Sequence, residues 1–222
     1  MDFPASLKYV FLDKAWFRKL AVLALYGLIP LLGFLVIGGW GLKVGKMVMD
    51  GNEEIALPKV KFSTDLRIGF LASVIDLIYA LPAAIFFLMT FGLARIGLNA
   101  EGLIGVLLII LGGLFGLVGL LLFVLWFLVG SAAFANFLAK NRFGAAFNLR
   151  ELLYMLRNSL GSWVLVVLGQ FLAMMILAPV GILFFGVGLL FTTAYAAVVY
   201  GHLLGQAYNH SVTPRDDEMV FQ

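Results

Sequence analysis

The segment 102–139 reads GLIGVLLIILGGLFGLVGLLLFVLWFLVGSAAFANFLA and contains no Asp, Glu, Lys or Arg. A helix needs roughly 20 apolar residues to cross the hydrocarbon core of a bilayer, so this run exceeds the requirement for one span. Three further runs approach or exceed that length without a charge: 20–42, 77–94 and 158–214. The pattern predicts an all-α fold, a polytopic transmembrane helix bundle that forms a single transmembrane domain over 1–222.

The composition supports a membrane protein. The chain is 63% hydrophobic and 12% charged, whereas soluble domains are about 45–50% apolar and about 25% charged. A core of this size cannot bury such an excess. The absence of cysteine excludes disulfides, thiol nucleophiles and thiolate metal sites. The first residues lack the early apolar run and the small-residue cleavage site of a secretory signal, so none is expected.

The basic residues predict the topology. Fourteen of the fifteen Lys and Arg residues fall before the first apolar run, between the first and second, between the third and fourth, or after the fourth, and Arg95 stands apart. Basic residues favour the cytoplasmic side, so an even number of crossings is expected between successive groups. This reasoning predicts six crossings as three tandem helical hairpins, with both termini and the tail 209–222 in the cytoplasm. The hairpins are expected over about 17–49, 66–140 and 158–208, with outer turns around Pro30, at 95–102 and around Pro179.

The first hairpin leaves alternatives open. Its first helix, Leu20 to Ile29, would cover only about 15 Å of a roughly 30 Å core. It forms a re-entrant pair, or it begins near Trp16 with Arg18 and Lys19 reaching back to the headgroups. The competing interpretation is one kinked span over 20–42, which gives five crossings and places the N-terminal cations outside.

An internal repeat marks the cytoplasmic ends of the even-numbered helices. The copies are WGLKVGK at 40–46, FANFLAK at 134–140 and YGHLLGQ at 200–206. Repeats of this kind predict parallel units related by an axis along the membrane normal. The small residues of each copy are four apart and share one helix face, where they let helix backbones approach closely in lipid. They are Gly41 and Gly45, Ala135 and Ala139, and Gly201 and Gly205; Leu203 is expected on the opposite, tolerant face.

Amphipathic connector helices are expected at the cytoplasmic interface. In 147–158, FNLRELLYMLRN, Leu149, Leu152, Leu153 and Leu156 follow helical spacing, and Arg150, Tyr154 and Arg157 follow it on another face. A shorter version is expected at 61–70, with Ser63 or Thr64 as its N-cap.

Four polar residues interrupt the apolar runs and form the candidate intramembrane polar site: Asp76, Asn136, Gln170 and His202. Asp76 follows Arg67 by nine residues, about 13 Å of helix, so it lies inside the core. An ionisable group at that depth usually faces protein or water. Its functional interpretation is a proton or cation site, and its structural interpretation is a carboxyl that holds helices together. Pro82 predicts a kink nearby.

The motifs resemble a known family. The run GLKVGKMVMDG at 41–51, then Leu57-Pro58, Phe62 and YALP at 79–82, is similar to an uncharacterised family of prokaryotic multi-pass membrane proteins known only as a domain of unknown function, and GHLLGQ at 201–206 fits as well. The resemblance implies an integral membrane protein of the prokaryotic plasma membrane and supplies no substrate or catalytic residue.

No enzyme motif is present, because the sequence lacks G-x-S-x-G, H-E-x-x-H and a phosphate-binding glycine loop with its lysine. We therefore expect no catalytic residue, metal site or cofactor, and no nucleic-acid partner. The favoured function is a non-enzymatic structural or scaffold component of a membrane complex. Its partners would be the lipid bilayer and other membrane subunits or a second copy. The alternative is a small transporter or channel for a proton, cation or small solute, using Asp76.

Overall fold

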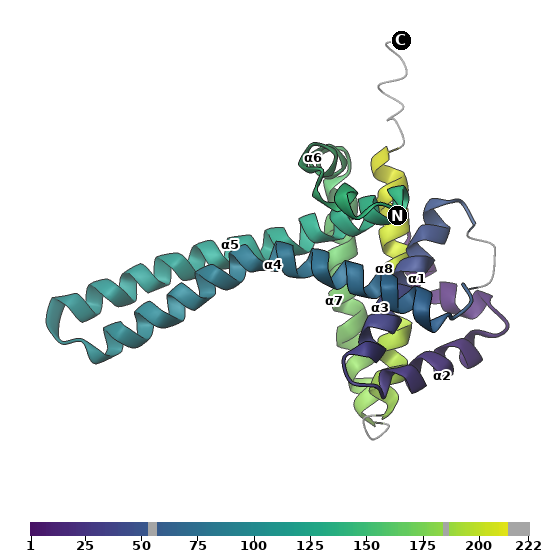
Figure 1. Cartoon of the computed structure of the whole chain (residues 1–222), viewed down its shortest axis with the longest axis horizontal. Coiled ribbons are helices and arrows are strands. Elements are labelled where there is room, and N and C mark those ends of the chain that lie inside the picture. The colour runs from purple at the N-terminus through teal and green to yellow at the C-terminus, as the bar shows by residue number, and fades with distance from the viewer. Residues whose placement is uncertain (53–56, 184–186, 213–222) are drawn as a thin grey trace, which may run out of the picture. The chain divides into compact units, whose positions relative to one another are not determined.

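The computed structural model describes residues 1–52, 57–183 and 187–212, and within these residues it contains helices and no strand (Figure 1). The elements are α1 (Phe3–Lys8), the 3-10 helix η1 (Tyr9–Leu12), α2 (Trp16–Gly27), α3 (Leu32–Met49), α4 (Phe62–Asn99), α5 (Gly102–Lys140), the 3-10 helix η2 (Phe143–Phe147), α6 (Leu149–Asn158), α7 (Leu160–Leu183) and α8 (Val187–Val212). The all-α class is confirmed. Within the described residues, five helices are long and apolar enough to cross a membrane: α3, α4, α5, α7 and α8.

The chain divides into two units. Residues 1–73 and 131–222 form the first, here called the bundle unit, and residues 74–130 form the second, here called the hairpin unit. The division cuts α4 after Ser73 and α5 before Ser131, so each long helix contributes to both units.

In the bundle unit, α8 packs against α3, α7 and α2. Figure 1 shows α7 and α8 side by side along their length. The core between α2, α3 and α8 contains the fully buried side chains of Leu20, Leu23, Trp40 and Val198. Because apolar side chains gain no hydrophobic energy from association in lipid, close packing must hold these helices together.

In the hairpin unit, α4 and α5 lie side by side and antiparallel (Figure 1). Small residues of α5 allow the contact: a Cβ added to Gly112 or Gly116 would lie 3.3 Å from atoms of Thr90, and one added to Gly119 would lie 3.3 Å from Phe86. Large apolar side chains such as Leu88, 70% exposed, point away from the pair. An exposed apolar surface of this kind suits lipid as the solvent.

The first hairpin follows one of the sequence alternatives. α2 begins at Trp16, as predicted, and it packs against α3 after a turn at 28–31 around Pro30. The chain does not form one helix over 20–42, because Leu31 has a positive φ of 61° and the chain folds back there. α2 is not among the five helices of the described residues that are long and apolar enough to cross a membrane, so the choice between five and six crossings stays a prediction. α2 has 12 residues, which cover about 18 Å at 1.5 Å per residue.

The third hairpin corrects two predictions. The predicted turn around Pro179 is wrong, since α7 continues through Pro179 to Leu183 and the next helix begins at Val187. In an apolar environment the backbone must satisfy its polar groups internally. The helix therefore continues through Pro179, although proline removes one backbone hydrogen bond. The predicted tail also begins later than residue 209, because α8 runs to Val212; the remaining tail, 213–222, lies outside the described residues.

Only one of the predicted connector helices is separate. Segment 61–70 is the beginning of the continuous helix α4, because nothing in the sequence between 70 and 74 breaks the helix. α6 is confirmed and starts after Asn148, whose side chain accepts a hydrogen bond from Glu151 N–H. Of its predicted apolar face, Leu152 is buried, whereas Leu149 and Leu153 are exposed.

Candidate functional site

Four glycines of the repeat lie where α3 crosses α8. A Cβ added to Gly201 would come within 2.0 Å of the Gly41 carbonyl oxygen, and one added to Gly45 within 2.8 Å of the Gly201 carbonyl oxygen. A Cβ added to Gly205 would lie 2.5 Å from Val48 Cβ. The backbones of the two helices are therefore in contact, an approach that only glycine permits at these distances.

Leu203 lies opposite the glycines, as expected, but that face of α8 is packed and not open. Its side chain is fully buried, and a Cβ added to Gly169 of α7 would lie 2.7 Å from Leu203 Cδ1. Because α8 packs against α3 on its glycine side and against α7 on the other, the face opposite the glycines is also core. In the second copy of the repeat, near the end of α5, Ala135 is buried and Ala139 is half-buried.

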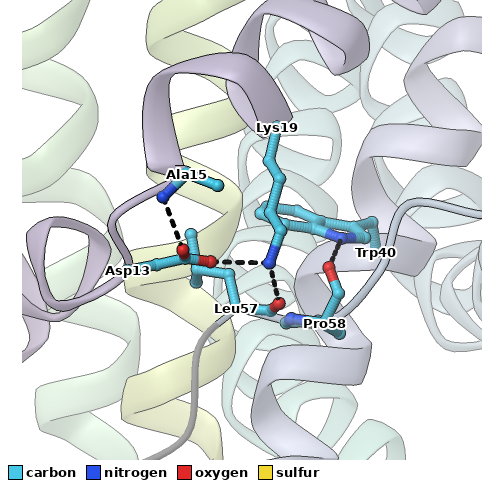
Figure 2. A network of polar contacts seen from close by, with 6 residues as sticks. All are labelled: Asp13, Ala15, Lys19, Trp40, Leu57 and Pro58. Atoms are coloured by element: carbon cyan, nitrogen blue, oxygen red, sulfur yellow. Dashed lines mark hydrogen bonds and ion pairs between the residues drawn. The ribbon is translucent and has the colours of Figure 1, made fainter.

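Three successive carbonyl groups in the connector between α3 and α4 each accept a hydrogen bond from a side chain of another element; we call this group the connector clamp. The donors are Lys19 Nζ to the Leu57 oxygen, Trp40 Nε1 to the Pro58 oxygen at 3.0 Å and Lys43 Nζ to the Lys59 oxygen at 2.8 Å. Figure 2 shows the first two, with Lys19 and Trp40 converging on the connector from α2 and α3. The clamp ties the beginning of α2 and the middle of α3 to the approach to α4.

Both lysines of the clamp also pair with a buried carboxylate. Lys19 Nζ lies 2.6 Å from Asp13 Oδ2, and Lys43 Nζ lies 2.6 Å from Asp65 Oδ1, whose side chain is fully buried. Backbone N–H groups add further hydrogen bonds: Ala15 N–H donates to Asp13 Oδ1 at 2.7 Å (Figure 2) and Lys61 N–H to Asp65 Oδ2 at 2.7 Å. Burial of a carboxylate is tolerable only with such partners.

Asp76 forms its contact inside the hairpin unit. Trp126 Nε1 of α5 donates a hydrogen bond of 3.0 Å to Asp76 Oδ1 of α4. The carboxyl therefore joins the two helices of the hairpin, as the structural interpretation requires.

Asn136 lies in a polar cluster at the end of α5. Its Nδ2 donates to the Ala145 oxygen and to Glu151 Oε2, both at 2.8 Å, and Lys140 Nζ lies 2.5 Å from the same Glu151 oxygen. The hydrogen bonds from Lys140 and Asn136 outweigh the effect of burial and hold the pKa of Glu151 below its usual value. Asn136 thus ties α5 to η2 and α6.

His202 lies under the N-terminal helix. Its Nδ1 is 2.8 Å from Ser6 Oγ of α1 and 3.1 Å from Gln206 Nε2 of α8, and its ring centroid lies 4.3 Å from that of Tyr9, with the two rings tilted by 39°. Gln170 of α7 has different surroundings, since its Oε1 is buried and has no hydrogen-bond partner within the described part of the chain. Each of the three bundle-unit residues Asn136, Gln170 and His202 therefore has a distinct environment.

The Asp76 contact, most of the connector clamp and the α3 side of the glycine contact with α8 fall within one family match, whereas Gly201, Gly205 and Lys19 lie outside it. The family model described as Protein of unknown function (DUF4013) matches residues 22–186. This chain belongs to the DUF4013 family. The resemblance read from the sequence is thereby confirmed. No curated protein and no solved structure shows a match to this DUF4013 chain.

The connector clamp was missed from the sequence, although the DUF4013 match contains most of it. Trp40 and Lys43 are three residues apart and so share one helix face. Pro58 lacks an N–H and favours extended backbone before it, which leaves carbonyl groups in need of donors. These two signals, taken together, could have predicted donation from α3 to the connector.

The arrangement provides hydrogen bonds and charge pairs that hold helices together. Among residues 1–52, 57–183 and 187–212, no group of three or more His, Asp or Glu side chains lies close enough to hold a metal ion. The buried carboxylate of Asp65 is paired, and the carboxyl of Asp76 accepts a hydrogen bond. These contacts are expected to stabilise the fold, and the contribution of the Lys19–Asp13 pair is expected to depend on pH.

We expect Lys19→Met to lower stability at neutral pH and to matter less in acid. Burial raises the pKa of Asp13, but the hydrogen bonds from Lys19 and from Ala15 N–H, with the lysine charge, bring it below its usual 3.8. A lowered folded-state pKa means that the pair stabilises fully above about pH 3.8 and loses this effect as pH falls through the folded-state pKa. Thermal unfolding in detergent from pH 7 to pH 3 is therefore expected to show a difference between wild type and Lys19→Met that shrinks below about pH 4.

A remnant of that difference is expected to persist in acid, because the hydrogen bond from Lys19 to the Leu57 oxygen does not titrate in this range. The matched control is Lys46→Met, whose partner Asp50 is exposed. A Lys19→Met effect that stays constant down to pH 3 would contradict the assignment of Asp13 as the titrating partner.

Proposed function

We propose that this DUF4013 chain is a non-enzymatic structural component of a membrane complex, a scaffold subunit in the plasma membrane of a prokaryotic cell. The observation that supports it is the contact of Asp76 with Trp126: the carboxyl deep in the apolar run is engaged by a donor on the adjacent helix. The hairpin unit around it presents apolar side chains outward. Such a surface suits contact with lipid or with another membrane helix.

We further propose six crossings, with both termini in the cytoplasm and α2–α3, α4–α5 and α7–α8 as parallel hairpins. Contacts within the bundle unit support a common end for the termini. The Met1 amino group lies 3.2 Å from His210 Nε2, and Asn209 Nδ2 donates to the Val48 oxygen at 3.0 Å. The ends of α3 and α8 and the N-terminus are therefore neighbours. Because α2 is short, local thinning of the bilayer completes the first crossing.

Reporter fusions test this topology. A reporter that is active only in the cytoplasm is expected to be active when fused before Met1 and when fused after Gln222, because the basic residues favour that side. A fusion inserted after Ala100, at the turn between α4 and α5, is the internal control and is expected to be inactive. Activity at one terminus alone would contradict an even number of crossings.

The scaffold role is tested by crosslinking in native membranes. A photoreactive amino acid in place of Leu88 is expected to give one discrete adduct with a membrane protein, because this side chain is 70% exposed on the hairpin unit. The same amino acid at the fully buried Trp163 is the control and is expected to give no intermolecular adduct. Lipid adducts alone at Leu88, and at other exposed positions of the hairpin unit, would contradict a scaffold role.

The second candidate is a small transporter or channel that uses Asp76. It draws support from the unpartnered Gln170 oxygen, since a buried polar atom without a partner at membrane depth is costly and often functional. Transport requires Asp76 to exchange protons or cations with water, so its replacement distinguishes the two candidates.

We expect Asp76→Asn to leave both stability and flux unchanged. The asparagine oxygen still accepts from Trp126 Nε1, whereas Asp76→Leu cannot, and interhelical hydrogen bonds in membranes contribute about 0.6 kcal/mol on average and up to about 1.7 kcal/mol. Thermal unfolding in detergent is expected to rank Asp76→Leu below wild type and Asp76→Asn. Proton and cation flux in liposomes is expected to match empty vesicles for all three proteins.

The control for that series is Trp126→Phe. It removes the same hydrogen bond from the other side, so the losses from Trp126→Phe and Asp76→Leu are not expected to add in the double variant. Flux by the wild type that Asp76→Asn abolishes would replace the scaffold proposal with the transporter.

A further inference from the structure

α6 packs against α7 and α8 of the bundle unit by one of its faces. Leu152 and Met155 are 1% and 2% exposed. Trp163 Nε1 of α7 donates to the Met155 oxygen at 3.1 Å, and Asn158 Nδ2 donates to the Ser211 oxygen of α8 at 3.4 Å. These contacts fix which side of α6 points away from the protein.

The orientation of α6 is that of a helix in the plane of the bilayer surface. In Figure 1, α6 is seen end-on while α7 and α8 run in the plane of the picture, so α6 lies across the two helices. α7 and α8 are candidate membrane spans, and α6 sits at the beginning of α7 and beside the end of α8. A helix crosswise to spanning helices at their ends lies at the interface between headgroups and acyl chains.

The outward face of α6 combines exposed leucines with exposed arginines. Leu149 and Leu153 are 62% and 51% exposed and lie one turn apart. Arg150 and Arg157 are exposed on the same side, because positions 150, 153 and 157 are three and four residues apart. At the bilayer surface this arrangement places apolar side chains against the acyl chains and guanidinium groups beside the phosphates.

The charge on this face is positive and uncompensated. Between Lys140 and Asn158 the chain carries four cations and one carboxylate, Glu151. That carboxylate is held by Lys140 and Asn136. Arg150 and Arg157 form no ion pair with any residue that the structure describes. Guanidinium groups bind phosphate oxygens through two parallel hydrogen bonds, which gives them geometric selectivity for such groups.

We infer that the outward face of α6 is a binding surface for anionic phospholipid headgroups, with Arg150 and Arg157 on the phosphates and Leu149 and Leu153 in the acyl-chain boundary. The inference rests on membrane insertion and is independent of the scaffold role. On this inference, anionic lipids are enriched among the lipids that contact α6.

The absence of cysteine in the chain makes a site-specific probe straightforward. The full-length variant Leu153→Cys is labelled with an environment-sensitive fluorophore and reconstituted into vesicles of phosphatidylcholine with phosphatidylglycerol. Bromine is placed on the acyl chains of one lipid at a time, at equal mole fraction. Brominated phosphatidylglycerol is expected to quench the probe more strongly than brominated phosphatidylcholine, by a local enrichment of about fivefold for each arginine.

Two variants in the labelled background separate the contributions. Arg150→Gln with Arg157→Gln is expected to equalise quenching by the two lipids while quenching itself persists, because Leu149 and the fluorophore at position 153 still insert. Arg95→Gln removes an exposed arginine outside α6 and is expected to leave the preference unchanged. Thermal unfolding and gel filtration establish that the double variant is folded; if it is not, Arg157→Gln alone is used and is expected to lower the enrichment about fivefold.

Three results would overturn the inference. Equal quenching by the two lipids in the wild-type background would show that the surface does not select anionic headgroups. No quenching by either lipid would place α6 away from the bilayer. Loss of the preference on addition of inorganic phosphate at a concentration that barely changes ionic strength would identify a site for the free anion instead of the lipid.

Discussion

Gly201→Ala is expected to lower the melting temperature in detergent by roughly 6–12 °C. A single methyl group at this position would lie 2.0 Å from the Gly41 carbonyl oxygen and 3.1 Å from the Gly45 nitrogen, both of which are backbone atoms that cannot rotate away. The helices α3 and α8 must therefore separate. Overpacking costs about 1–3 kcal/mol, with more at rigid contacts, and about 3 kcal/mol corresponds to this shift for a chain of this length.

The matched control is Gly38→Ala on α3. A Cβ there meets no atom within 4 Å. Alanine is favoured over glycine in a helix interior by about 1 kcal/mol, so this variant is expected to leave the melting temperature unchanged or to raise it. The same substitution is therefore expected to have opposite signs at two glycines that both lie in apolar helices. Equal effects at Gly38 and Gly201 would show that α3 and α8 are not in backbone contact.

Leu203 cannot serve as the control, although the repeat suggested it. Its side chain is fully buried against the region around Gly169 of α7. Leu203→Ile is expected to be mildly destabilising through a change of shape in a packed core, typically by less than about 1.5 kcal/mol. Gly41→Ala is expected to resemble Gly201→Ala, because a Cβ there would lie 2.5 Å from the Ala197 oxygen.

Lys43→Met is expected to be the most damaging change within the connector clamp. It leaves the fully buried carboxylate of Asp65 without its cation and removes the donor to the Lys59 oxygen. Removing one partner of a buried pair costs about 3–5 kcal/mol, because the remaining charge stays in a medium that solvates it poorly. Since Lys43 keeps some exposure, we expect the lower end of this range and a fall in melting temperature of roughly 6–12 °C.

Lys46→Met is the control for this change, on the same helix and with the same substitution. Lys46 pairs with Asp50 at 2.8 Å, but the Asp50 side chain is 45% exposed and that of Lys46 is 28% exposed, so the carboxylate of this pair is solvated. Exposed pairs at this spacing contribute about 0.3–0.5 kcal/mol, so a shift of no more than about 2 °C is expected.

The double variant Lys43→Met with Asp65→Leu sharpens the test. Replacing both members of a buried pair by apolar residues is often neutral, so much of the lost stability is expected to return. If the double variant were less stable than Lys43→Met alone, the cost would come from the connector hydrogen bonds and not from an unpaired charge. The measurement in each case is thermal unfolding of the purified chain in one detergent.

The sequence by itself determined the class of the protein and the approximate place of its helices. Charge-free apolar runs longer than about 20 residues are too apolar to be exposed to water and are stable as helices in a bilayer. The all-α class could therefore be predicted, and Pro30 marked the turn because proline ends a helix. The amphipathic period of 149–158 located α6 in the same way. The motif around residues 41–51 and 79–82 identified the family, which the match over 22–186 confirms.

Only the tertiary structure decided which apolar side chains are core. In water an apolar side chain faces inward, so periodicity reports burial; in lipid, apolar side chains face both ways and the pattern loses that meaning. Leu203 and Leu88 look alike in the sequence, yet one is fully buried and the other is 70% exposed. Pro179 looked like a turn, although the helix continues through it.

The connector clamp and the partners of the polar residues were likewise decided by tertiary contacts. Lys19 and Leu57 are 38 residues apart, and Asp76 and Trp126 are 50 residues apart. Composition indicates that a buried carboxyl needs a donor, because an unpaired charge in an apolar medium is costly. It does not say which donor, since that depends on how distant helices cross, and the crossings follow from backbone contacts such as Gly41 with Gly201.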